Sequence, residues 1–440
     1  MPRSYADRAV ALATLSAVLD RNRPLEDAFD EAAGDKAGGN KAGGDRLSAR
    51  DRGFARLIAS TTLKRLGQAD DLIAQCLEKP LAASAQPVRH ALRLGVVQLL
   101  FLDVPAHAAI DSAVSLLGKT RHAGFKGLAN AVLRRLDRDG KAMLEAQDAA
   151  RLNMPDWLWH LLSTVYGDTT ARAIAAANLT DPPLDISVAA DAALWAERLE
   201  GVLLPTGTIR RGFGGAISDL PGYAEGAWWV QDAAAALPAL LLGDVAGKNV
   251  IDLCAAPGGK TAQLAAMGAH VTAIDRSAKR LQRLSRNLER LGLSASVEAA
   301  DGTVWTPAEP ADALLLDAPC SATGTIRRHP DVALGKTPAD VTKLSALQDR
   351  LLDHAAELVK PGGLLVYATC SLLPAEGEER IAALLDRAPA AWERVPVDPA
   401  EIGGWRECVT PDGDLRTLPC HLAEQGGLDG FYAARLRRLG

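Results

Sequence analysis

The sequence predicts an α/β protein in which an all-helical region is followed by a domain built on a doubly wound parallel sheet. Two observations lead to this prediction. In the first third of the chain, apolar residues recur at spacings of three and four, which is the period of helices packed on one another. After Gly247, short apolar runs bounded by turns alternate with helical patterns, as in strand–helix–strand units with right-handed crossovers.

Residues 1–140 are predicted to form the helical domain. The helical pattern covers Ala6–Leu19, Arg50–Leu66, Ala69–Leu77, Pro87–Leu102, Ala108–Leu117 and Phe125–Leu136. Between the first two stretches, residues 34–46 (GDKAGGNKAGGDR) have alanine as their largest apolar side chain, so we expect a flexible loop there.

Residues 141–238 are predicted to form a connecting subdomain. Helical patterns cover Pro155–Val165 and Thr170–Ala177. The segment Asp181-Pro182-Pro183 must end the second helix, because proline lacks a backbone N–H and restricts the residue before it. Turns and short strand-like pieces follow.

Residues 239–440 carry the alternation of strands and helices. The expected strands are Asn249–Leu253, His270–Ile274, Ala313–Leu316 and Leu364–Ala368. One expected helix begins at Thr261, and two others span Ala278–Leu291 and Ala339–Val359. Ligands of such sheets bind beyond the carboxyl ends of the strands, and each motif described below falls at such an end.

The composition limits the class of protein. With 440 residues, of which 48% are hydrophobic, the chain is expected to be a soluble protein of more than one domain, without a membrane span. Six cysteines without paired spacing and eight histidines without ligand spacing predict reduced thiols, no metal and a cytoplasmic location. The net charge of −5 argues against a protein that coats nucleic acid indiscriminately, but it leaves room for a local basic face. We expect a monomer.

A glycine turn follows the first expected strand, within residues 252–261 (DLCAAPGGKT). Gly258 and Gly259 let the backbone pass close to a ligand, and the amides of the next helix favour a carboxylate or phosphate. Asp275 closes the second strand, where an acid can accept both hydroxyls of a ribose, and Asp301 after the third strand suits an adenine. The glycine patterns of dinucleotide and phosphate-loop proteins are absent. This combination fits S-adenosylmethionine better than a nucleotide cofactor.

Two cysteines follow the ends of strands that we expect to be neighbours: Cys320 in Asp-Ala-Pro-Cys and Cys370 in Thr-Cys-Ser. Carbon 5 of cytosine is a poor nucleophile, but a thiolate that adds to carbon 6 makes carbon 5 able to attack a sulfonium methyl group. A base then removes the carbon 5 proton, and the thiolate leaves. This is nucleophilic catalysis. Spacing alone leaves the two cysteines interchangeable, one attacking and the other assisting.

Charged residues near the thiols have expected roles. Asp317, at the end of its strand, can hold the exocyclic amine or a protonated ring nitrogen of cytosine and so stabilise charge that develops on the ring. A positive charge such as Arg327 or Arg328 would raise the acidity of the nucleophilic thiol.

These motifs give the chain a family resemblance. The segments DLCAAPGGKT, DAPCSATGTIRRHPD, ATCSLLPAEGEE and DGFYAARL resemble the RNA 5-methylcytosine methyltransferases of the RsmB (Sun) group. The helical first third is similar to the NusB RNA-binding fold of the bacterial ribosomal-RNA members, most clearly at GLANAVLRRL (127–136). The resemblance implies a NusB-like domain followed by a Rossmann-like class I S-adenosylmethionine-dependent methyltransferase domain.

The resemblance also implies roles for individual residues. The resemblance implies that Cys370 attacks the base and that Cys320 assists product release. The residues that match the family's cofactor pocket are Cys254, Ala255, Ala256, Pro257, Gly258, Gly259, Lys260, Asp275, Asp301 and Asp317. The segment Trp229-Val-Gln-Asp232 resembles the one that closes the methionine end of this pocket. Small-subunit ribosomal RNA is the implied substrate, and the connecting subdomain is expected to contribute to RNA binding.

The chain departs from the family pattern in places. Ala322 replaces the usual glycine of the Pro-Cys motif, and Ala236 stands where a glutamine often follows Gln-Asp. Ile186-Ser-Val-Ala189 replaces a Leu-Arg-Val-Asn segment, which leaves the target nucleotide open. Other readings are the same chemistry on transfer RNA or another RNA, a non-catalytic RNA-binding assembly factor, and a DNA cytosine methyltransferase that uses the Pro-Cys cysteine.

A run of cations in the helical domain is the expected RNA contact, although such a run is usually a solvated face. Its members are Lys119, Arg121, Lys126, Arg134, Arg135 and Arg138.

Overall fold

The computed structural model describes residues 5–34, 47–118, 120–212 and 214–439. They form two compact units. The helical unit comprises Met1–Ser163, Ala171–Leu179 and Arg328–Gly335, and the sheet unit comprises Thr164–Thr170, Thr180–Arg327 and Lys336–Gly440. The chain crosses repeatedly from one unit to the other, so neither is a continuous stretch. The division into three domains at residues 140 and 238 stays a prediction, and all but the first residue of the loop expected at 34–46 lies outside the described residues.

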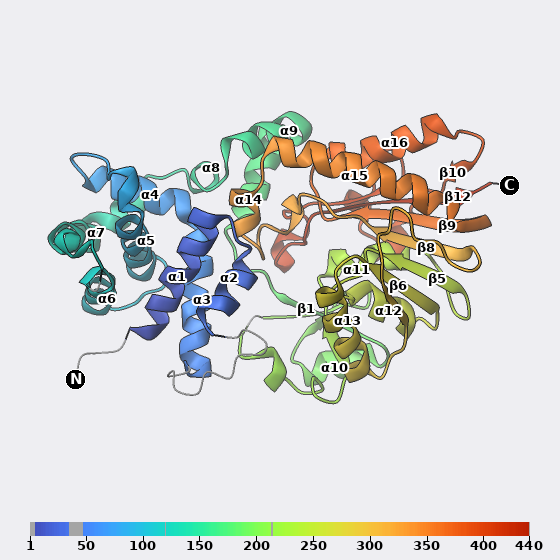
Figure 1. The fold of residues 1–440 in the computed structure, drawn as a ribbon, viewed down its shortest axis with the longest axis horizontal. Coiled ribbons are helices and arrows are strands. Elements are labelled where there is room, and N and C mark those ends of the chain that lie inside the picture. Colours follow the sequence, from blue (N-terminus) through green and yellow to red (C-terminus); the bar gives the residue numbers. More distant parts are fainter. Residues whose placement is uncertain (1–4, 35–46, 119, 213, 440) are drawn as a thin grey trace. The chain divides into compact units, whose positions relative to one another are not determined.

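The helical unit has no strand in its described part (Figure 1). Its helices are α1 (Ala6–Arg21), α2 (Leu25–Ala32), α3 (Ala49–Lys64), α4 (Leu66–Cys76), α5 (Gln86–Leu100), α6 (Ala106–Gly118), α7 (Lys126–Glu145), α8 (Ala149–Leu152) and α14 (Asp331–Gly335), with the short turns η1 (Ala83–Ala85) and η2 (Ala123–Phe125). The long helix α9 (Asp156–Asn178) is broken at Gly167, whose φ is 79°, so its halves correspond to the two helical stretches expected there.

Helix α5 is the centre of this unit because it contributes to two cores. Leu92 packs with residues of α4, α6 and α7, whereas Leu94 packs with residues of α1, α2 and α3. A Cβ added at Gly95 would lie 2.7 Å from the Leu133 side chain of α7, so glycine is needed for the close approach of these helices. The later helix α14 also belongs here, since the Leu25 N–H donates to Asp331 Oδ2 at 3.0 Å.

The sheet unit contains a small antiparallel sheet of order β2-β3-β1-β4. Its elements are β1 (Leu184–Val188), α10 (Ala192–Arg198), β2 (Val202–Leu203), β3 (Ile209–Arg211), η3 (Ile217–Asp219) and β4 (Trp228–Val230). Arg210 donates two hydrogen bonds of 2.7 Å to the buried Asp185, and Asp185 also accepts the Ala233 N–H at 2.9 Å. This carboxylate therefore fixes the small sheet to the start of the following helix.

The large sheet has the order β10-β12-β9-β8-β5-β6-β7, with β11 paired to β12. Its strands are β5 (Asn249–Leu253), β6 (His270–Asp275), β7 (Ser296–Ala299), β8 (Ala311–Asp317), β9 (Val359–Thr369), β10 (Trp392–Arg394), β11 (Leu415–Thr417) and β12 (Phe431–Arg438). The strands from β9 to β7 are mutually parallel, as predicted. β12 is antiparallel to β9, so the sheet as a whole is mixed.

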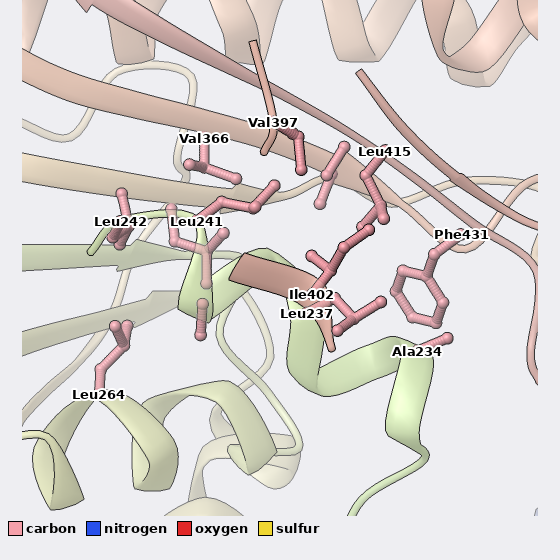
Figure 2. Close-up of a cluster of buried hydrophobic side chains, with 14 of the residues drawn as sticks. Ala234, Leu237, Leu241, Leu242, Leu264, Val366, Val397, Ile402, Leu415 and Phe431 are labelled. Carbon is pink, nitrogen blue, oxygen red and sulfur yellow. The ribbon is translucent and has the colours of Figure 1, made fainter. Parts of the chain in front are cut away.

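Helices cover both faces of the large sheet, as a doubly wound fold requires. Ala313 and Leu315 of β8 face a core with α11 (Ala233–Leu240) and α12 (Gly259–Ala266). Figure 2 shows side chains of this core, among them Leu237 of α11, Leu264 of α12 and Val366 of β9. Leu314 and Leu316 face the opposite core. The alternation follows from the two-residue period of a strand. The remaining elements are α13 (Ala278–Leu291), α15 (Pro338–Glu357), α16 (Glu378–Arg387), η4 (Thr323–Thr325), η5 (Pro374–Glu376), η6 (Pro399–Ile402), η7 (Arg406–Cys408) and η8 (Ala423–Gln425).

Candidate active site

The glycine turn between β5 and α12 is shaped for a ligand. Cys254 and Gly258 have φ angles of 66° and 105°, in the left-handed region. A Cβ on Gly258 would also lie 2.6 Å from Leu284 Cγ, so glycine is required there on both counts. At Gly259, the first residue of α12, an added Cβ would come no closer than 3.9 Å to the nearest atoms, which belong to Gln231. A side chain at Gly259 would thus meet Gln231 at an ordinary van der Waals distance, so the turn requires glycine most clearly at Gly258.

A buried acid beside this turn lacks part of its hydrogen bonding. Asp252 Oδ2 accepts the Thr261 hydroxyl at 2.5 Å, but Asp252 Oδ1 has no partner among the described residues. Burial raises the pKa of Asp252 to about 7. A ligand that brings a positive charge to the first turn of α12 would satisfy this oxygen. S-adenosylmethionine carries an ammonium group and a sulfonium centre, so these residues fit it.

The two acids predicted for the ribose and the adenine differ in their surroundings. Asp275 is buried and accepts the N–H groups of Ser277 at 2.8 Å and Ala256 at 3.3 Å, so it ties the glycine turn to the end of β6. Asp301 is exposed and accepts the N–H and hydroxyl of Thr303. These hydrogen bonds lower the pKa of Asp301 below its usual value. The structure places Asp275 at the turn and Asp301 at the surface beyond β7.

An ion pair lies at the ends of α12 and β8. Lys260 Nζ donates to Asp317 Oδ2 at 2.7 Å and lies 4.9 Å from the centre of the Phe431 ring. Burial alone would lower the pKa of Lys260, but the charge and hydrogen bond of Asp317, with a smaller contribution from Cys370, raise the pKa of Lys260 overall. Lys260 therefore remains a cation beside the Asp317 carboxylate.

The two predicted cysteines meet. β8 and β9 are parallel neighbours with Asp317 paired to Ala368, and Cys320 Sγ lies 3.4 Å from Cys370 Sγ. Their hydrogen bond, followed by burial, raises the pKa of Cys320 well above its usual value. Burial also raises the pKa of the third nearby cysteine, Cys254, to about 12. Both Cys254 and Cys320 therefore hold their protons more firmly than an ordinary thiol does.

The expectation that Arg327 activates a thiol is wrong. The side chain of Arg327 is 1% exposed; its Nε donates to Asp429 at 2.5 Å and its Nη2 to Asp232 at 2.8 Å. The guanidinium is thus committed to two buried carboxylates. Arg328 belongs to the helical unit.

The sequence reasoning also missed two buried acids. Asp252 stands inside the apolar strand NVIDL, which is a detectable signal because an acid is rarely buried without a role. Glu376, in the segment after Cys370, accepts hydrogen bonds from the loops of both cysteines. Because it does not lie in an apolar strand, nothing in the sequence around it indicated that it is buried.

The cationic segment of the helical unit is solvent-exposed at Lys126, Arg134 and Arg135, whereas Arg138 pairs with Asp139 at 2.8 Å. Lys119 lies outside the described residues. Within the described ranges, there is no cluster of three or more histidine, cysteine or acidic side chains that could hold a metal ion. A search of the same ranges for a helix long and apolar enough to cross a membrane also finds none.

The fold and the site together define a class of protein. A parallel sheet whose first strand leads through a glycine turn into a helix, with an acid closing the second strand, is the arrangement of Rossmann-like S-adenosylmethionine-dependent methyltransferases. The paired thiols at the same edge of the sheet add a nucleophilic centre.

Comparison with known proteins identifies the family. The family model described as 16S rRNA methyltransferase RsmB/F matches residues 239–437, and the NusB family model matches residues 6–138. Ribosomal RNA small subunit methyltransferase B of Pseudomonas putida is 40% identical over 421 residues, covering 90% of this chain and 92% of the relative. The corresponding protein of Cronobacter sakazakii is 35% identical over 411 residues, covering 89% and 91%. The chain belongs to the RsmB/F family of 16S rRNA methyltransferases, and the predicted family, fold class and cofactor are confirmed.

Solved structures agree on the fold. The crystal structure of PH0851 aligns with a TM-score of 0.76 and 24% identity over 98% of both chains. A methyltransferase homolog protein from Pyrococcus horikoshii aligns with a TM-score of 0.53 and 27% identity, covering 64% of this chain and 94% of that one.

Proposed function

We propose that this enzyme methylates carbon 5 of a cytosine in small-subunit ribosomal RNA, through a covalent adduct between Cys370 and carbon 6. The observation that carries the proposal is the pair of thiols, 3.4 Å apart, at the edge of the sheet that holds the cofactor turn. Methyl transfer to an oxygen or an amine needs no such pair, whereas attack at carbon 6 and later release both call for a thiol.

The family resemblance favours Cys370 as the nucleophile. The resemblance of its Thr-Cys-Ser motif to that of the family implies this role for Cys370, while the 3.4 Å separation of the two sulfurs leaves Cys320 beside it for the release step. The Cys370 thiolate forms the bond to carbon 6, and the displaced electron pair makes carbon 5 nucleophilic. S-adenosylmethionine supplies the electrophilic methyl group. A base takes the carbon 5 proton, which restores the double bond and returns the sulfur–carbon electron pair to Cys370 as a thiolate; Cys320, whose sulfur lies 3.4 Å away, is placed to assist this release.

The cofactor would be held by the residues around the glycine turn. Gly258 and Gly259 provide the cradle before α12, and Asp252 offers its unpaired oxygen to a cationic group. Asp275, at the end of β6, would bind the ribose, and Asp301, beyond β7, would contact the adenine end. Asp317, the last residue of β8, pairs with Lys260 and would contact both the cofactor and the cytosine ring.

The NusB-like unit would bind RNA through its exposed cations, and the match of both relatives over nine-tenths of the chain supports 16S ribosomal RNA as the substrate. We place the enzyme in the cytoplasm, where its substrate is made. We also propose that it acts as a monomer.

Two cysteine variants test the mechanism. Cys370→Ala cannot form the bond to carbon 6, so it should show neither methyl transfer nor a covalent complex. Cys320→Ala should attack and methylate but release slowly, so protein linked to RNA should accumulate. Denaturing gels with labelled ribosomal RNA measure the adduct, and bisulfite sequencing locates the methylated cytosine.

Cys420→Ala is the matched control, because Cys420 is a half-buried thiol of the same unit. It should behave as the wild type. An adduct that accumulates in Cys370→Ala would reverse the two roles and point to a Pro-Cys nucleophile. Full activity in both variants would exclude covalent catalysis by either thiol.

A further inference from the structure

A single buried carboxylate joins the loops that carry the two cysteines. Glu376, the last residue of η5, is fully buried. Its Oε1 accepts the Ser321 N–H at 2.8 Å and the Gln348 amide at 3.2 Å. Its Oε2 accepts the Ser321 hydroxyl at 2.5 Å and the Ser371 hydroxyl at 2.6 Å. Both oxygens are therefore occupied by neutral donors that the fold holds in place.

These donors are the immediate neighbours of the thiols in the chain. Ser321 follows Cys320, and Ser371 follows Cys370. Gln348 also donates to the Pro319 carbonyl at 2.9 Å. Two bonds join the loops directly: the Gly324 N–H donates to the Cys370 carbonyl at 2.9 Å, and the Leu372 N–H donates to the Thr323 hydroxyl at 2.9 Å. The two loops are 50 residues apart in the sequence, and they converge on one side chain.

We propose that Glu376 is a positioning residue, which acts through Ser321 and Ser371 to hold the Cys320 and Cys370 sulfurs side by side so that they can act in turn on one cytosine. The inference rests on the proposed function, because only a reaction that needs both thiols needs their distance fixed. Burying a carboxylate costs more free energy than burying a well-packed apolar side chain of similar volume, so a contribution to stability alone does not account for Glu376.

The hydrogen-bond chemistry separates this role from one that needs the negative charge. In Glu376→Gln, the amide oxygen can take the place of Oε1, and the amide nitrogen can donate to the two serine hydroxyls, which rotate to accept. The junction is then kept without its charge. In Glu376→Ala, the buried Ser321 N–H loses its partner and the two loops lose their common anchor.

The distance between the thiols can be measured without RNA by a reagent that needs both. Phenylarsine oxide forms one As–S bond with each of two adjacent thiols, and the two thiol protons leave with its oxygen as water. We expect wild type and Glu376→Gln to capture it with similar affinity. Glu376→Ala and the double variant Ser321→Ala/Ser371→Ala should capture it at least roughly tenfold more weakly, the scale of one lost buried hydrogen bond.

Activity and folding are followed in the same variants. At saturating RNA and cofactor, Glu376→Gln should stay within a few-fold of the wild-type kcat, whereas the other two should lose roughly tenfold or more, with unchanged S-adenosylmethionine affinity. Cys320→Ala should capture no arsenical, which shows that the reagent needs both thiols. Ser112→Ala is the matched control, since it removes a buried hydroxyl with one hydrogen bond from the helical unit.

The outcomes are decisive in either direction. If Glu376→Ala does not fold, the double serine variant decides, because it removes two hydroxyls and leaves the carboxylate in place. Wild-type arsenical affinity in a variant that has lost its anchor would overturn the inference, even if that variant were less stable. Loss of activity and capture in Glu376→Gln as severe as in Glu376→Ala would also overturn it. A wild type that captures arsenical but methylates no RNA would count against the proposed function instead.

Discussion

Replacing Arg327 by methionine should cost the protein a large part of its stability. The substitution keeps an unbranched side chain of similar reach but removes the cation from between Asp232 and Asp429, whose side chains are each 5% exposed. Each lost charged hydrogen bond contributes about 1.5–3 kcal/mol, and removing one partner of a buried ion pair costs about 3–5 kcal/mol. We therefore expect the free energy of unfolding to fall by about 3–5 kcal/mol, as measured by urea denaturation.

The control is Arg387→Met, which breaks an exposed pair with Asp353 and should cost less than about 1 kcal/mol. The same experiment separates the two possible roles of Arg327. If the guanidinium stabilises the fold, iodoacetamide should alkylate the Cys370 thiol of folded Arg327→Met at the wild-type rate. Wild-type stability combined with a tenfold slower alkylation would refute the structural argument and restore the role of thiol activator.

Three further predictions concern the cofactor, the RNA and the loop of the first cysteine. Asp275→Ala should weaken S-adenosylmethionine binding by about 1–3 kcal/mol in calorimetry, and unchanged affinity would remove Asp275 from the site. Changing Lys126, Arg134 and Arg135 to glutamate should weaken RNA binding and lower the slope of log affinity against log salt concentration by roughly one per lost phosphate contact. Unchanged affinity at low salt would show that these three cations do not contact RNA. Ala322 has a φ of 59°, so Ala322→Gly should raise the free energy of unfolding by up to about 1 kcal/mol, and a lower thermal midpoint would contradict this.

The parts of the fold that sequence patterns predicted are those with a clear local period. β5 was predicted at its observed bounds because its apolar run is flanked by turns, and α13 because its apolar residues repeat along one face. β12 was missed because Phe431 and Tyr432 enter opposite cores, so the strand shows no alternation of apolar and polar residues. α2 has 8 residues, too few to show a helical period.

The sequence predicted only those site residues that belong to motifs at the ends of strands. Cys320 and Cys370 were expected to meet because the carboxyl ends of neighbouring parallel strands share one edge of the sheet. Arg327 was misjudged because it stands close to Cys320 in the sequence, whereas its partners are 95 and 102 residues away. Glu376 was missed for the same reason, since its contact with Ser321 joins residues 55 apart. Such contacts depend on where each side chain points, and the spacing of residues along the sequence does not indicate that direction.

The membership of α14 in the helical unit has a consequence for how the chain is made. The hydrogen bond from the Leu25 N–H cannot form until Asp331, 306 residues further along the chain, has been synthesised. At the usual pace of translation, this interval lasts roughly 15–60 s. The amino-terminal helices therefore leave the ribosome well before the last helix of their own unit exists, and both the cofactor turn and Cys320 are synthesised in the meantime. A nascent chain arrested after residue 163 should accordingly be more open to proteolysis around α1 and α2 than one arrested after residue 335.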